Sequence, residues 1–282
     1  MFDHCKEAKW LIISIFLIIQ PVLSVLQNYV FLKNEYCLNI YKAIAQATSG
    51  LILPTLVFYL LSILLIVIIL FILFGKLKLK DLGIELAKIR QAFLVLILLW
   101  IIINIVFAIS SLIVDGAVNW HSSWNEKGIL VVIGVFLGQI FGNAFYEEIA
   151  FRGFLLPQLY LKLNGFYKNS IKKKILLALI LSQLYFALIH IPHRLANDIH
   201  GSALIIDLIV TFIMGIIFAL YYLRTKNLLL VIGIHSILNY PTALVASPVD
   251  GQIISGILIL LLLVFWPQIT NSLKFIAPRQ RI

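Results

Sequence analysis

The chain alternates between long apolar runs and short polar loops. A helix needs about 20 mainly apolar residues to cross the hydrocarbon core of a bilayer. Eight runs approach that length: 10–31, 51–74, 92–114, 129–150, 175–191, 204–223, 228–246 and 253–269. The fourth run could also continue through Phe154, Leu155 and Leu156 to Pro157. The alternating pattern of a transmembrane β-barrel strand is absent, so helices are the remaining spanning element. The pattern predicts an all-α fold, a polytopic transmembrane helical bundle with about eight spans.

The composition agrees with a membrane protein and argues against a soluble one. Apolar residues make up 62% of the 282 positions and charged residues only 12%, against about half and a quarter in soluble domains. The net charge of +10 comes from short loops between apolar runs rather than from one basic domain. We therefore expect the lipid bilayer, and no nucleic acid, as a partner. Cys5 and Cys37 form no metal-binding spacing and no disulfide framework.

The distribution of basic residues predicts the orientation. Of the 22 Lys and Arg residues, 18 lie in one set of alternate segments. These segments are the N-terminal tail, the loops 75–91, 151–174 and 224–227, and the C-terminal tail. Basic loops stay in the cytoplasm. We expect a multi-pass protein of the cell membrane with both its N- and C-termini cytoplasmic.

Several ionisable residues lie inside the apolar runs, where they are costly. They are Glu147, Glu148, Arg152, His190 and His235. Such a residue at a helix centre costs about 2.5–3.5 kcal/mol on insertion scales, and a Leu or Ile returns only about 0.3–0.6 kcal/mol. Charges kept at this cost are expected to be paired, solvated or functional.

Helical spacing separates these residues into two roles. Glu148 and Arg152 are four residues apart and can pair on one face. Glu147 lies about 100° around the helix from Glu148 and is expected to stay unpaired. Glycines at spacing four let a neighbouring helix pack closely on another face. These are Gly134, Gly138 and Gly142.

Two later runs each carry a histidine with a second residue of interest four positions away. Phe186 and His190 share a face of the 175–191 run, and His235 and Asn239 share a face of the 228–246 run. Three helices would then direct polar groups from one face each, as a shared polar cavity in a bundle requires. We expect Tyr146 and Gln183 to support this cavity by hydrogen bonds to the residues that line it. The residues His193, Arg194, Asp198, His200 and Asp207 lie near outer helix ends, and we assign them no function.

Three motifs together resemble one known family. Glu147-Glu148-Ile149-Ala150-Phe151-Arg152-Gly153 looks like the EExxxR(G) motif of the CAAX-protease and bacteriocin-processing (CPBP, or Abi) family of intramembrane proteases. Phe186 to His190 matches that family's FxxxH motif, and His235 to Asn239 matches its HxxxN motif. The resemblance implies three parts: 1–126 with about three N-terminal spans, 127–246 as the CPBP-like catalytic core, and 247–282 as the last span with a basic cytoplasmic tail.

The resemblance also implies a role for each matched residue. Glu147 and His190 would activate the hydrolytic water, and His235 and Asn239 would bind the oxyanion at the scissile carbonyl. Glu148, Arg152 and Phe186 would support the site. Carboxylate and imidazole groups suit general-base work, and imidazole and carboxamide donors suit a developing negative charge.

Metal dependence stays open at this point. Glu147, His190 and His235 are also a plausible zinc set of two histidines and a glutamate, and family members are often labelled metalloproteases. The sequence lacks the HExxH pair that places two ligands and a base on one helix. We prefer a reaction that requires no cofactor, in which the glutamate activates water, with zinc as the alternative.

The resemblance implies an intramembrane endopeptidase whose substrate is a membrane-associated peptide or protein. The Ile-, Leu- and Lys-rich composition is typical of an AT-rich bacterium, which favours peptide processing or bacteriocin self-immunity. Two other functions are considered. A non-catalytic scaffold or immunity protein would not require Glu147 beside two histidines, and a proton-coupled transporter predicts paired repeats and broken helices that the sequence lacks.

Overall fold

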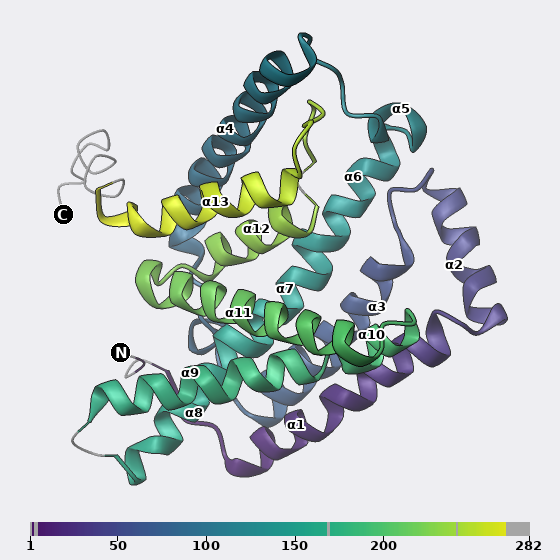
Figure 1. The fold of residues 1–282 in the computed structure, drawn as a ribbon. Helices are drawn as coiled ribbons and strands as arrows, with labels where there is room; N and C mark the ends of the chain where they lie inside the picture. The colour runs from purple at the N-terminus through teal and green to yellow at the C-terminus, as the bar shows by residue number, and fades with distance from the viewer. Residues whose placement is uncertain (1, 3–4, 168–169, 241, 269–282) are drawn as a thin grey trace.

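The computed structural model describes residues 2, 5–167, 170–240 and 242–268, and these residues form helices and loops without a β-strand (Figure 1). Six helical runs are apolar and long enough to cross a membrane: Trp10–Phe31, Pro54–Phe74, Leu86–Asp115, Ile129–Gly165, Ile171–Ala196 and Gly201–Thr225. Two shorter apolar helices follow, Leu228–Asn239 and Gly251–Val264. The predicted all-α transmembrane bundle is confirmed, with six long helical runs and two short helices where eight spans were expected.

The long runs are built from the following helices. The first three runs hold α1 (Trp10–Val25), α3 (Pro54–Ser62) and α4 (Ile89–Asp115). The fourth holds α6 (Ile129–Gly138), α7 (Ala144–Glu147) and α8 (Leu156–Lys162), joined by the π-helical segments Gln139–Asn143 and Glu148–Leu155. The later helices are α9 (Ile171–Leu188), α10 (Ile191–Ala196), α11 (Gly201–Thr225), α12 (Leu228–Asn239) and α13 (Gly251–Val264).

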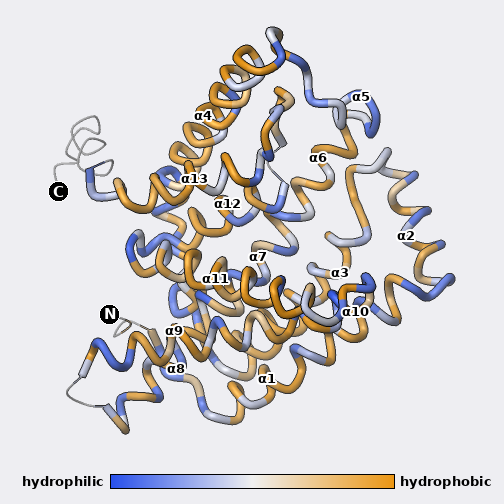
Figure 2. The backbone as a smooth tube through the Cα atoms, viewed as in Figure 1, coloured by the Kyte–Doolittle hydropathy of each residue, from blue (hydrophilic) through white to orange (hydrophobic). Residues whose placement is uncertain are grey.

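The surfaces of these helices are apolar, as a lipid environment requires. Figure 2 shows hydrophobic residues along the helices and hydrophilic residues mainly in the connections between them. On α4, for example, Ile101, Ile105 and Ile109 are exposed, whereas Leu99, Ile103 and Phe107 on the opposite face are buried. The exposed apolar side chains account for the high hydropathy of the chain.

The fourth run extends well past its expected end at residue 150. It remains helical to Gly165, and Arg152 is completely buried inside it. Arg152 therefore belongs to the helix and not to the loop 151–174, and the alternative end of the run at Pro157 is closer to the structure than the end at residue 150. An end at residue 150 would place Glu147 near the end of its helix, whereas in the structure it lies near the midpoint of the run Ile129–Gly165.

The seventh predicted span is too long. Helix α12 ends at Asn239 rather than at residue 246, and Tyr240 has an extended backbone with φ −153° and ψ 93°. The residue that precedes a proline is disfavoured in the helical region, and Pro241 follows Tyr240 in the sequence. The backbone beyond it is hydrogen-bonded by side chains: Trp124 donates to the Ala243 carbonyl and Asn104 accepts from Leu244 N–H.

Helix α2 (Glu35–Ala47) was not predicted. Its sequence is too polar for a span, and its start is capped because the Asn34 side chain accepts a hydrogen bond from the backbone N–H of Cys37. The helix is amphipathic and lies outside the six long apolar runs. It follows α1 and leads the chain back toward α3.

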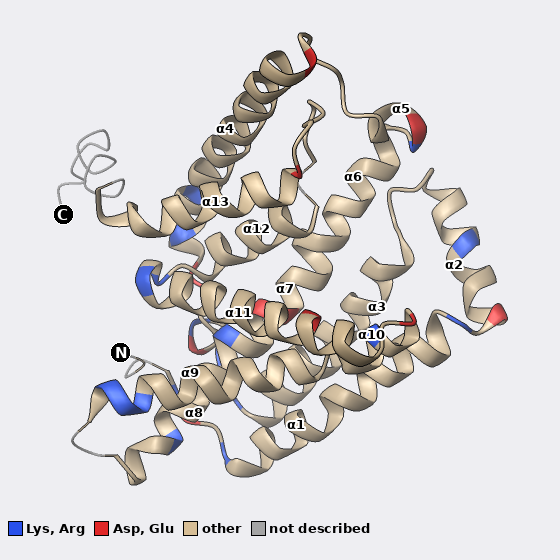
Figure 3. Cartoon of the chain, in the orientation of Figure 1, with Lys and Arg blue, Asp and Glu red and all other residues tan. Residues whose placement is uncertain are grey.

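The basic segments meet at one end of the bundle. Lys6 Nζ donates to the Lys76 carbonyl, Lys162 Nζ to Glu7, and Lys88 Nζ to the Lys226 carbonyl. Figure 3 shows basic residues gathered around α8, the start of α9 and the end of α11. At the other end, backbone hydrogen bonds join residues 119–121 to residues 244–246. The expected basic C-terminal tail lies outside the described residues.

The glycine face of the fourth run packs closely, as its spacing predicted. A Cβ on Gly134 would collide with the carbonyl oxygen of Gly50 and lie 2.8 Å from that of Leu51. A Cβ on Gly142 would lie 3.4 Å from the Tyr59 side chain. The segment that leads into α3, together with α3 itself, is therefore held against the helix that carries Glu147.

Candidate active site

A buried ion pair forms the base of the site. Glu148 and Arg152 are completely buried, and Arg152 Nη1 donates to Glu148 Oε1 over 3.1 Å. Arg152 Nη2 donates to the Gly215 carbonyl of α11 over 3.1 Å, and the guanidinium lies 4.3 Å from the centroid of the Phe186 ring. The predicted pair exists, and through Arg152 it connects the fourth run to α9 and α11.

His235 of α12 is oriented by this ion pair. Its Nδ1 lies 2.7 Å from Glu148 Oε1, and its ring stacks on Phe218 with centroids 4.4 Å apart. An ionised carboxylate only accepts hydrogen bonds, so Nδ1 carries the hydrogen in this contact. Nε2 then points toward the second carboxylate, 3.8 Å from Glu147 Oε2.

His190 is oriented in the same way from another helix. It follows the end of α9, and its Nδ1 lies 2.7 Å from the carbonyl oxygen of Phe186. A carbonyl only accepts, so Nδ1–H is the donor and Nε2 is an unprotonated acceptor in the neutral ring. Nε2 lies 3.9 Å from Glu147 Oε1. Ser24 of α1 donates to the neighbouring Ile189 carbonyl over 2.9 Å and ties this turn to the first helix.

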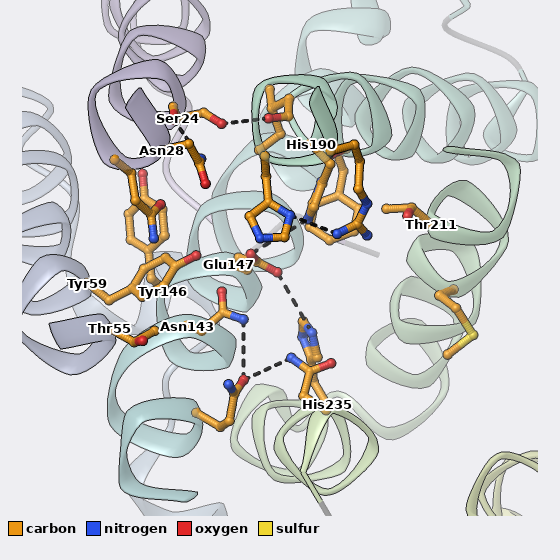
Figure 4. A pocket seen from close by; sticks show the side chains of 18 of the residues that line it. Ser24, Asn28, Thr55, Tyr59, Asn143, Tyr146, Glu147, His190, Thr211 and His235 are labelled. Atoms are coloured by element: carbon orange, nitrogen blue, oxygen red, sulfur yellow. Dashed lines mark hydrogen bonds and ion pairs between the residues drawn. The ribbon is translucent and has the colours of Figure 1, made fainter. Parts of the chain in front are cut away.

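Glu147 lies between the two histidines. It is buried, and each of its carboxylate oxygens faces the Nε2 of a different histidine at 3.8–3.9 Å. These distances exceed hydrogen-bond length. Figure 4 shows the side chains of His190 and His235 directed toward Glu147 from opposite sides. The midpoint position of Glu147 in its run explains how residues from three helices reach one another.

Asn239, the last residue of α12, is held beside the histidine on its own helix. Its Nδ2 donates to Gln139 Oε1 over 2.9 Å, and Asn143 Nδ2 donates to the same oxygen over 3.3 Å. The shared acceptor Gln139 fixes the orientation of both carboxamides. One N–H of the Asn239 carboxamide stays available for another acceptor.

These residues line a cavity of about 740 Å³ within the bundle. Its walls come from α1, α3, α9, α10, α11, α12, α13 and the fourth run. The wall includes Leu32, Thr55, Asp207 and Gln252, which lie toward the end of the bundle away from the basic loops. The predicted convergence of Glu147, His190, His235 and Asn239 around one polar cavity is present in the geometry.

Sequence reasoning missed the contribution of the first two runs. Polar residues of α1 and of the π-helical segment Leu26–Phe31 that continues it line the cavity: Gln20, Ser24, Gln27 and Asn28. Polar residues of α3 line it as well: Thr55, Tyr59 and Ser62. Both sets follow the spacing of one helix face, a signal that the sequence contained and that a search restricted to charged residues overlooked.

Of the two residues expected to support the cavity by hydrogen bonds, Tyr146 lines it and Gln183 does not. Tyr146 lines the cavity, and its hydroxyl accepts a hydrogen bond from the Gln20 side chain of α1. Gln183 is completely buried and donates to Ser182 Oγ over 2.8 Å. It lies outside the cavity wall and packs against Gly215.

Three residues that received no functional assignment also line the cavity. They are His193, Arg194 and Asp207. Arg194 Nε donates to Asp207 Oδ2, and this ion pair links α10 to α11. The outer helix ends therefore contribute charge to the cavity.

The side chains of Glu147, His190 and His235 are the candidate ligands for a zinc ion. Tetrahedral Zn²⁺ takes nitrogen and oxygen ligands at about 2.0–2.2 Å from a common centre. In the part of the chain that the structure describes, no group of three or more His, Cys, Asp or Glu residues has an arrangement that could hold a metal ion. Glu147, His190 and His235 do not form such a group in this geometry, with the Nε2 atoms of the histidines 3.9 and 3.8 Å from the oxygens of the carboxylate.

Comparison with known proteins gives one match. Residues 128–241 match the family model described as type II CAAX prenyl endopeptidase Rce1-like. The matched segment contains the three motifs that hold the buried ion pair, both histidines and Asn239. No curated protein and no solved structure matches the chain.

Proposed function

We propose that the chain is an intramembrane endopeptidase, and the match of residues 128–241 to the Rce1-like type II CAAX prenyl endopeptidase model supports this proposal. The substrate in this proposal is a membrane-associated protein or peptide. One observation carries the proposal: a buried carboxylate, Glu147, lies between the Nε2 atoms of two histidines from different helices. A purely structural charge would be paired, as Glu148 is.

Glu147 and His190 supply the acceptors that activate water. Both His190 Nε2 and Glu147 Oε1 are acceptors and lie 3.9 Å apart. A water that donates one hydrogen to each would keep its lone pairs free for attack. In the proposed step its oxygen bonds to the scissile carbonyl carbon while Glu147 takes its proton.

His235 and Asn239 then stabilise the charge on the carbonyl oxygen. Asn239 has an N–H that Gln139 does not use. His235 donates Nδ1–H to Glu148, and in its protonated form it donates from Nε2 as well. Collapse of the tetrahedral intermediate breaks the C–N bond, and Glu147 returns the proton to the leaving nitrogen. Glu148, Arg152 and Phe186 position these groups.

We propose that the reaction proceeds without a metal. The arrangement of Glu147, His190 and His235 supports a carboxylate that acts on water directly. Zinc is the alternative, and activity after stringent chelation decides between them. Complete loss of activity that zinc restores would contradict the metal-free reaction.

For the biological setting we propose a cell-membrane protein with both termini in the cytoplasm. The contacts among the basic loops at one end of the bundle support this orientation. Bacterial peptide processing or bacteriocin self-immunity is the proposed role. The alternative is a non-catalytic scaffold or immunity protein of the same fold.

The test compares the peptides of cells that carry the wild-type protein, Glu147→Gln or His235→Ala. We expect loss of at least one processed peptide in both variants, with cleavage reduced by at least about 100-fold. General-base catalysis by Glu147 contributes about 10²–10⁴-fold, and removal of an oxyanion donor such as His235 costs about 10²–10³-fold. The purified wild-type protein should then cleave the precursor of that peptide in reconstituted membranes. Mass spectrometry of the products identifies the scissile bond.

Glu126→Gln is the matched control, because Glu126 is exposed on α5 (Ser123–Glu126) and does not line the cavity. It should process the peptide like the wild type. If Glu147→Gln and His235→Ala accumulate normally and keep the biological activity, the scaffold hypothesis is right and the protease hypothesis is wrong.

A further inference from the structure

Arg194 is the one Lys or Arg residue among the described residues that line the cavity. It lies on α10, one helical turn after His190, and its backbone N–H donates to the His190 carbonyl over 3.0 Å. A cation is therefore fixed beside the proposed hydrolytic site.

Two of the three guanidinium nitrogens of Arg194 have protein partners. Nε donates to Asp207 Oδ2, and Nη1 contacts His193 Nδ1 at 2.9 Å. Thr211 Oγ1 donates to the same Asp207 oxygen over 3.4 Å and restrains it. In the described part of the chain, Nη2 has no hydrogen-bond partner, and the Arg194 side chain is 21% exposed.

We propose that Arg194 binds a carboxylate of the peptide substrate and so sets which peptides are cleaved. This inference rests on the proposed peptidase function. The planar guanidinium keeps donors for a second carboxylate while Asp207 holds Nε, and arginine matches carboxylates with paired hydrogen bonds. Binding within a bundle of low polarity strengthens such a contact relative to water.

The spacing places this carboxylate near the scissile bond. One helical turn advances about 5.4 Å, and an extended peptide advances about 3.3 Å per residue. A carboxylate about two residues from the cleaved bond would therefore reach Arg194. This carboxylate is either the C-terminus of the peptide or an Asp or Glu side chain. Both present the same group to the guanidinium.

The test uses full-length protein in reconstituted membranes and a fluorogenic peptide library made in three forms. One form has free C-terminal acids, one has C-terminal amides, and one replaces Asp and Glu by Asn and Gln. We expect the wild type to prefer a carboxylate-bearing form by about tenfold or more in kcat/KM, which corresponds to one charge-assisted hydrogen bond. The preference should arise from a lower KM and not from a higher kcat. Loss of preference on amidation identifies the C-terminus, and loss on replacement of Asp and Glu identifies a side chain.

Three variants separate recognition from structure. Arg194→Gln should cleave all forms at similar rates, and Arg194→Lys should keep part of the preference because it keeps the charge. Asp207→Asn breaks the same ion pair but leaves the guanidinium, so it should keep the preference for a carboxylate.

Two results would overturn the proposal, and they differ from each other. If Arg194→Gln slows cleavage of all forms equally while the wild type cleaves them well, Arg194 is only a tether between α10 and α11. In that case the proposed peptidase function stands. If the wild type cleaves none of the forms, the peptidase function fails and the inference fails with it.

Discussion

At the scale of single residues, two neighbouring glutamates have different surroundings. Glu148 Oε1 accepts from both Arg152 and His235, whereas Glu147 faces two histidines at distances beyond a hydrogen bond. The helix separates them by about 100°, which turns one carboxylate toward the ion pair and the other toward the cavity. A change at Glu148 should therefore act on stability first, and a change at Glu147 on chemistry.

This difference predicts the behaviour of Glu148→Ala. The substitution leaves Arg152 buried without its carboxylate, and breaking such a pair costs about 3–5 kcal/mol. We expect a clear loss of thermal stability for the detergent-purified protein, measured by intrinsic fluorescence. Glu147→Ala should keep a melting temperature close to that of the wild type.

A double-mutant cycle checks the assignment. Arg152→Leu in the Glu148→Ala background removes the unpaired charge, so the double variant should be more stable than the sum of the single effects implies. Strictly additive effects would show that the two residues do not stabilise the fold as a pair.

At the scale of helices, Gly153 explains the last position of the first motif. A Cβ there would collide with the Leu82 carbonyl oxygen and lie 3.2 Å from the Leu228 side chain. Leu82 belongs to a short 3₁₀ turn, Leu79–Leu82, that packs on the segment Glu148–Leu155. A backbone carbonyl cannot move aside as a flexible side chain can.

Gly153→Ala should therefore destabilise the protein by about 1–3 kcal/mol, the usual cost of overpacking. The loss would be visible as a lower melting temperature in detergent. Gly256→Ala on α13 is the matched control, because a Cβ at Gly256 meets nothing within 4 Å. Equal melting temperatures for the two variants would show that this contact does not limit the packing.

Much of the helical layout was predictable from the sequence because apolar length is a local property. The runs 10–31 and 51–74 end where the structure ends them. The fourth run was cut short at residue 150 because Glu147, Glu148 and Arg152 lower its average hydropathy, although their partners bury them. Hydropathy averaged over neighbouring residues does not show contacts with side chains of other helices.

The site shows the same division between local and non-local information. Spacing within one helix predicted the pair of Glu148 with Arg152 and the common face of His235 and Asn239. It could not show that His190 hydrogen-bonds the Phe186 carbonyl or that Gln139 holds Asn239, since these contacts depend on backbone ends and on other helices. The charge of Arg194 at the cavity was missed for the same reason.

At the scale of the whole molecule, the cavity and the basic loops occupy different ends of the bundle. Basic residues gather where the N-terminal segment, α8 and the end of α11 meet. The cavity wall instead includes Thr55 at the start of α3 and Gln252 at the start of α13. If the basic end is cytoplasmic, the cavity lies in the outer half of the membrane and its substrate approaches from outside.

Labelling of single cysteines in intact cells tests this arrangement, in a background where Cys5 and Cys37 are replaced by serine. A membrane-impermeant maleimide should label Asn125→Cys in the outer loop and Thr55→Cys at the cavity, both exposed positions. It should label Phe166→Cys, between α8 and α9, only after the membrane is permeabilised, because lysines beside that loop favour the cytoplasm. Labelling of Phe166→Cys in intact cells with protection of Asn125→Cys would reverse the orientation and place the approach of the substrate on the cytoplasmic side.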